Sequence, residues 1–219
     1  MPDGAVGEIA APQVSRDNPC PFLRALVAGN YVGGHIVPLP ELSETIDLAT
    51  GKTGLPALIA RVQIFMVAMI ANGLGPVSQL RSLTRGAILD RLRNGPLDKH
   101  GAGSRILDQH AIVHEDEIAR LASFGKDYPN PDGGTERGLT RPEIMTFMAA
   151  NFERAKDDHP WFYRVRRCYY PLLMRGEWPV LLDIMGKGQG EKRYLSVAEV
   201  RTLFAERRFP ARIIALLKR

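Results

Sequence analysis

Apolar side chains recur at helical spacing along most of the chain. Near the start, Phe22, Leu23, Leu26 and Val27 follow this period until Gly29 interrupts it. The same period predicts further helices at about 40–50, 55–72, 76–93, 112–124, 141–156, 160–175, 178–185, 196–207 and 210–217. No strict alternation of apolar and polar residues is long enough to indicate a sheet. The pattern therefore predicts an all-α fold, with short hairpins allowed in the glycine-rich connections.

Two of these helices carry a capping-box pattern at their start. Thr140 and Glu143 stand three residues apart, with Pro142 early in the first turn. Ser196 and Glu199 repeat that spacing before an apolar run. The two long connections are predicted as loops at 128–138 and 186–192.

The most apolar run of the chain lies at 55–75 and approaches the length of a membrane span. It carries Arg61 and Gln63 in its first half, which argues against insertion into a bilayer. We therefore expect a buried core helix here, and no membrane as a partner.

The composition is that of one folded domain. The 219 residues are 45% hydrophobic and 24% charged, which is close to the globular norm. Residues 1–16 are rich in Ala, Gly and Pro without periodicity, so we expect a disordered or loosely draped tail there. Residues 17–219 are then predicted to form a single helical domain.

Charge and cysteine content narrow the function classes. The net charge of +5 is diffuse, and aromatic residues do not alternate with basic ones, so nucleic acid is not expected as a partner. Two cysteines are too few for a disulfide framework. The first residues lack the basic and apolar regions of a secretion signal, so we expect a cytoplasmic protein.

Cys20 stands between two prolines where the first helical pattern begins. Proline is favoured at the first helical position, which makes Cys20 the N-cap and Pro21 the first helical residue. The N–H groups of Phe22 and Leu23 and the positive end of the helix dipole then favour a thiolate. Such a thiolate can be a nucleophile, a redox sensor or a metal ligand, and the pattern does not choose among them. Cys168 lies in an apolar run and fits a buried structural cysteine.

Three segments, in this order, carry a resemblance to a known family. "NPCPFLRALVAGNYVGG" at 18–34 resembles the Pro-Cys-Pro segment that opens the heme-thiolate peroxidases, the family of chloroperoxidase and the unspecific peroxygenases. "LDQHAIVHEDEIARLASFG" at 107–125 is similar to the acidic, histidine-containing segment of that family. "YLSVAEVRTLFAERRFP" at 194–210 is similar to its late helix, which ends in Arg-x-Pro. The order and spacing agree over about 190 residues.

The resemblance implies a helical domain that encloses heme b, with Cys20 as the axial ligand of the iron. A cysteine thiolate pushes electron density onto the iron and favours cleavage of the O–O bond of hydrogen peroxide. The resemblance therefore implies an oxidoreductase dependent on hydrogen peroxide, either a peroxidase or a peroxygenase. Its substrate would be a small organic molecule or a halide.

The family also uses a glutamate to move the peroxide proton, steadied by a histidine or an arginine. By resemblance, Glu177 in "YYPLLMRGEWP" takes this role after a two-residue insertion. His114 stands where the family's acidic segment carries a glutamate. It is our candidate to orient Glu177 or to act as the base itself, because imidazole exchanges protons near neutral pH.

A divalent cation near a heme propionate is a further feature of the family. Asp116 matches the family's aspartate, whereas Ile118 replaces its serine, and Glu115 is the residue that would take over as a ligand. Carboxylate and carbonyl oxygens would suit Mg²⁺. The same acidic residues also fit the solvated first turn of a helix, and both alternatives stay open.

Two other functions stay open beside the resemblance. His110 and His114 lie four residues apart and would share a helical face with Asp116 or Glu117 nearby, as in a zinc or iron site without heme. The chain would otherwise be a non-catalytic helical binding module, related to the family but without heme.

Overall fold

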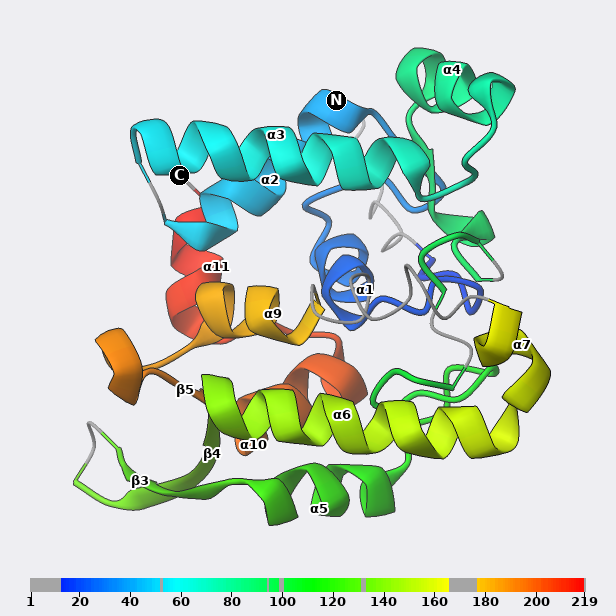
Figure 1. The fold of residues 1–219 in the computed structure, drawn as a ribbon. Coiled ribbons are helices and arrows are strands. Elements are labelled where there is room, and N and C mark those ends of the chain that lie inside the picture. The colour runs from blue at the N-terminus through cyan, green and yellow to red at the C-terminus, as the bar shows by residue number, and fades with distance from the viewer. Residues whose placement is uncertain are drawn as a thin grey trace, which may run out of the picture.

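The computed structural model describes residues 13–51, 53–93, 95–98, 101–130, 133–165 and 177–218. The described chain is mainly helical, as predicted, with two small sheets (Figure 1). The helices are α1 (Pro21–Ala28), α2 (Leu39–Thr50), α3 (Leu55–Ile70), α4 (Pro76–Arg85), α5 (Glu115–Phe124), α6 (Arg141–Asp158), α7 (Pro160–Val165), α9 (Glu177–Met185), α10 (Val197–Arg201) and α11 (Ala211–Leu217). Two short 3₁₀ segments and one π-helical segment complete them: η1 (Leu89–Arg91), η2 (Gly190–Lys192) and η3 (Thr202–Glu206).

Helix α1 lies in the middle of the molecule. Figure 1 shows α2 and α3 on one side of it and α5 and α6 on the other. Its apolar face is buried, with Leu26 fully enclosed and the ring of Phe22 edge-on to that of Phe209 at a centroid distance of 4.9 Å. The helix gives way to a turn at Gly29, as predicted, and the ring of Tyr31 approaches so closely, 2.3 Å from where a Cβ atom would lie, that only glycine fits there.

Short antiparallel strands form the two sheets. β1 (Ile36–Val37) pairs with β2 (Ala87–Ile88), and β3 (Lys126–Pro129), β4 (Thr135–Thr140) and β5 (Tyr194–Ser196) form the larger sheet. The connection predicted as a loop at 128–138 therefore lies mostly in the hairpin of β3 and β4, which agrees with the short hairpins allowed in the glycine-rich connections. These strands have at most six residues, too few for their alternation to stand out in the sequence.

The helix predicted at 76–93 stops at Arg85. Gly86 follows with φ 100°, a conformation that favours glycine, and a Cβ atom there would lie 2.2 Å from the carbonyl oxygen of Val37. This close approach lets β2 pair with β1. Of the helix predicted at 160–175, the described residues contain α7, and the remainder lies outside them.

One capping box is confirmed and the other is wrong. At the start of α6 the N–H of Thr140 donates to Oε2 of Glu143 at 2.8 Å. Ser196 is the N-cap of α10, but its hydroxyl donates to Oε2 of Glu136 at 2.7 Å. The carboxylate of Glu199 accepts a hydrogen bond from Nη2 of Arg212 at 2.7 Å. Partners from other elements therefore replace the local box.

Helix α3 is less buried than its sequence predicts. Leu55 is 68% exposed and Leu58 59% exposed, whereas Ala57 and Ala68 are buried. The helix packs on α2 and α4 at the periphery of the molecule (Figure 1), and large apolar side chains along it are exposed to solvent. Among the described residues, no helix combines the length and the apolar character needed to cross a bilayer.

Trp178 joins three elements in the core, and its replacement tests the packing. It is 2% exposed, lies edge-on to Phe147 of α6 at 5.4 Å and stacks on Phe204 of η3 at 6.2 Å. We expect Trp178→Ala to lower the free energy of unfolding by about 3–5 kcal/mol, measured by urea denaturation, because it leaves a cavity. Val180→Ala, at an exposed position of the same helix, should change it by less than about 0.5 kcal/mol. Equal unfolding midpoints for the two variants would contradict this packing.

Candidate functional site

Cys20 occupies the position that the flanking prolines predict. It is the N-cap of α1, in an extended conformation with φ −82° and ψ 112°, and the helix begins at Pro21. Its N–H donates to Oδ1 of buried Asn18 at 3.0 Å, and its carbonyl oxygen accepts the N–H of Arg24 at 3.0 Å. The half-buried side chain packs against the main apolar cluster. The sulfur therefore lies at the positive end of a helix and at the edge of the core.

His114 is also an N-cap, at the start of α5. Its N–H donates to the carbonyl oxygen of Ile106 at 2.8 Å, which fixes the entry to the helix. Its ring lies between two carboxylates, with Nε2 3.6 Å from Oδ2 of Asp108 and Nδ1 3.9 Å from Oδ1 of Asp116. The side chain is 45% exposed, so it stands at the surface with both ring nitrogens facing acidic groups.

His110 lies outside α5, and the predicted pair of histidines on one helical face is therefore wrong. The helix begins at Glu115 and not at residue 112. Ala111 takes φ 61°, which turns the chain out of the helical conformation between the two histidines. In the part of the chain that the structure describes, no three His, Cys, Asp or Glu side chains are grouped to hold a metal ion.

Glu115 and Asp116, the predicted cation ligands, have different surroundings. Both carboxylate oxygens of Glu115 accept hydrogen bonds from Arg201, with Nη2 at 2.8 Å and Nε at 3.1 Å. Asp116 is 82% exposed in its side chain. The arginine thus contacts the oxygen atoms that a cation would use at Glu115.

The neighbouring Glu117 has a structural role that the sequence pattern did not indicate. It is buried and accepts two hydrogen bonds from Arg154 of α6, at 3.0 Å from Nη1 and 2.6 Å from Nη2. This hydrogen bonding raises the pKa of Arg154. These two parallel hydrogen bonds join α5 to α6 and hold in place the helix that follows His114.

Glu177, the predicted acid-base residue, is the first residue of α9. The structure describes its backbone but not its side chain. Cys168 and Gly176 lie outside the described residues. The start of α9 is held in place by Trp178, which is buried in the core directly after Glu177.

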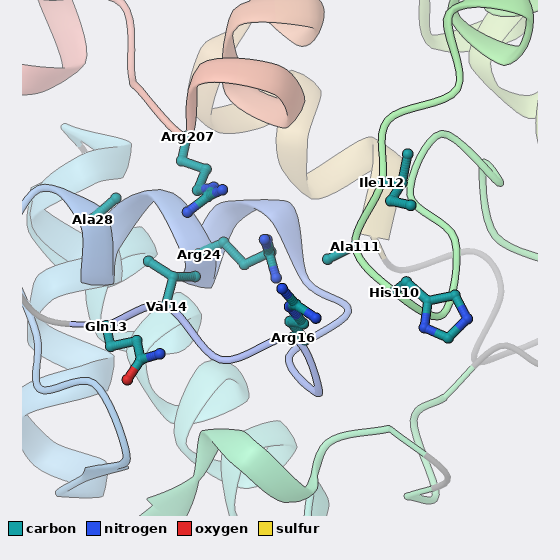
Figure 2. A pocket seen from close by; sticks show the side chains of 9 residues that line it. All are labelled: Gln13, Val14, Arg16, Arg24, Ala28, His110, Ala111, Ile112 and Arg207. Carbon is teal, nitrogen blue, oxygen red and sulfur yellow. The ribbon is translucent and has the colours of Figure 1, made fainter.

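A cavity of about 560 Å³, which sequence reasoning missed, opens beside α1. One wall is the loop at 110–112, which precedes α5, and Arg24 of α1 lies across from it (Figure 2). The N-terminal segment contributes Arg16, and the segment after η3 contributes Arg207. These residues are far apart in the sequence and share no motif, so no local pattern could have found them.

Asp108 shapes the loop wall of this cavity. Its Oδ1 accepts the N–H groups of His110 and Ile112, each at 2.8 Å. The hydrogen bond from Ile112, then that from His110, holds the pKa of the Asp108 carboxyl below its usual range. The charged form of Asp108 therefore closes the turn that places Ala111 and Ile112 in the wall of the cavity.

Comparison with known proteins adds no relative, since no family model, no curated protein and no solved structure matches the chain. The fit to a heme is thus judged from the residues themselves. Cys20 fits a thiolate ligand, because it is half-buried at a helix N-terminus beside apolar side chains. Of the two proposed acid-base residues, the structure describes the side chain of His114 but not that of Glu177.

Proposed function

We propose that this protein is a heme-thiolate oxidoreductase that uses hydrogen peroxide, as a peroxidase or a peroxygenase, on a small organic molecule or a halide. The position of Cys20 carries the proposal. A thiol between two prolines, at the N-cap of the central helix and against the apolar core, has the setting of a thiolate ligand.

The arrangement of the three resembling segments supports the proposal. They are widely separated in the sequence, yet the third packs on the helix that Cys20 begins and the second lines a cavity beside it. Phe209 of the third segment meets Phe22 of α1, and Ala111 of the second shares a cavity with α1. The pair of Glu115 and Arg201 joins the second segment to the third. A common site around α1 is what a shared cofactor would require.

The proposed roles of the residues follow from their chemistry. A bound heme b would supply the oxidising chemistry. Cys20 would hold the iron through its sulfur, with the negative charge favoured by the N-terminal end of α1. The carboxylate of Glu177 would accept a peroxide proton and return it, and the imidazole of His114 would orient that carboxylate or exchange the proton itself. A cation such as Mg²⁺ would need Glu115 to leave Arg201.

Reconstitution with heme tests the proposal. The purified chain is mixed with hemin, freed of unbound hemin by gel filtration, and assayed for peroxide-dependent oxidation of a small aromatic reporter. We expect about one heme to stay bound per chain and the activity to require both heme and peroxide. Free hemin at the same concentration is the control. A chain that elutes without heme would overturn the proposal.

A further inference from the structure

Arginine side chains from three separate parts of the chain meet at the cavity beside α1. Arg16 comes from the segment before α1, Arg24 from α1 itself and Arg207 from the residue that follows η3. Figure 2 shows the side chain of Arg24 pointing from α1 toward the loop that carries Ala111, with Arg16 near its end, and the side chain of Arg207 reaching toward α1. Positive charge is thus concentrated around one opening.

Arg24 is buried without a counter-charge. It is 3% exposed, and its Nη1 donates to the carbonyl oxygens of Ser15 at 2.8 Å and Asn18 at 3.4 Å. Its Nε is buried with no hydrogen-bond partner. Burial, followed by the positive charges of Arg207 and Arg93, lowers the pKa of Arg24. A buried cation in this setting is destabilising unless an anion joins it.

Within the described residues, no carboxylate neutralises this cluster. None of Arg16, Arg24 and Arg207 forms an ion pair there. The carboxylate of Asp108, close in sequence to the loop residues that line the cavity, accepts hydrogen bonds from the N–H groups of its own loop. Glu206, next to Arg207 in the sequence, pairs with Arg208 at 2.6 Å.

We propose that this cavity binds a small oxyanion, a phosphate or carboxylate group, held by Arg24 and Arg207 with Arg16 beside them. The planar guanidinium group donates two parallel hydrogen bonds to such groups, which a lysine does not match. The anion would balance the like charges that now face one another. The site does not depend on the proposed heme, although the carboxylates of a bound porphyrin are one source of the same chemistry and a free metabolite is the other.

Inorganic phosphate is the probe, titrated calorimetrically into the heme-free full-length chain at low ionic strength. We expect saturable binding at one site. Arg207→Gln should weaken it by roughly 10- to 100-fold, the usual effect of losing hydrogen bonds to a charged group. Arg208→Gln is the matched control, because it removes the same charge from the adjacent residue, which pairs with Glu206. It should change the affinity by no more than about twofold.

Arg16→Gln provides a second variant at an exposed position, so folding is not at risk, and it should also weaken binding. A titration without saturation, or equal weakening by Arg207→Gln and Arg208→Gln, would overturn the proposal. Repeating the titration after heme loading separates the two sources. Retained phosphate binding indicates a free oxyanion as the ligand, and its loss in step with heme uptake indicates the porphyrin carboxylates. Phosphate binding by a chain that takes up no heme would refute the proposed function and leave this site standing.

Discussion

Cys20→Ala is expected to abolish the thiolate-type heme spectrum, whereas Cys168→Ala should leave it intact. Cys20 stands at a helix N-cap between prolines, where a thiolate is favoured, whereas in the sequence Cys168 has no proline beside it. The measurement is the absorption of the dithionite-reduced, carbon monoxide-bound protein, in which thiolate ligation gives a Soret band at about 450 nm. Both variants remove one thiol, so a general loss of cysteine cannot explain a difference between them.

Folding has to be checked in the same samples. The Cys20 side chain makes no capping hydrogen bond to the helix, so Cys20→Ala should keep the far-ultraviolet circular dichroism of the parent. An unchanged band at about 450 nm in well-folded Cys20→Ala would show that Cys20 is not the ligand.

Glu177→Gln is expected to keep the thiolate-type spectrum while slowing the reaction with hydrogen peroxide by roughly 10²- to 10⁴-fold, the usual effect of a positioned acid-base group. The amide is nearly isosteric with the carboxylate but does not accept the peroxide proton. Stopped-flow mixing of the heme-loaded protein with peroxide measures the rate directly. A rate equal to that of the parent would show that Glu177 is not the acid-base residue.

His114→Ala should act in the same direction as Glu177→Gln. If the two residues work as a unit, the double variant should cost less than the two single costs combined. His35→Ala is the histidine control, since His35 is exposed beside β1 and contacts Asp90 at 2.6 Å. If His114→Ala reacts with peroxide much more slowly than the parent while Glu177→Gln reacts at the parent rate, His114 is the base by itself.

Much of the helical fold could be predicted, because the apolar spacing and the capping residues of a helix lie close together in the sequence. Apolar spacing gave the extent of α2 and α11 to within a residue or two, and the prolines placed the start of α1. Short hairpins could be expected in the glycine-rich connections, but the positions of the strands could not be predicted, since they are only two to six residues long and some pair with distant segments. The break at Gly86 likewise depends on its contact with Val37.

In the candidate site, too, only the features that depend on neighbours in the sequence could be predicted. The N-cap position of Cys20 depends on its neighbours in the chain and could therefore be predicted. The partners of charged side chains could not, because they come from other elements: Arg201 meets Glu115, and Arg154 meets Glu117. The cluster of Arg16, Arg24 and Arg207 at the cavity could not be predicted from residue spacing either, since only the fold brings residues 16 and 207 close to α1.

Thiolate ligation of heme by Cys20 is tested most directly by one absorption spectrum of the parent protein. The heme-loaded chain is reduced with dithionite and exposed to carbon monoxide. We predict a Soret band at about 450 nm, the signature of a heme iron bound by a cysteine thiolate. A band at the shorter wavelength typical of an imidazole ligand, or a chain that retains no heme, would contradict the account.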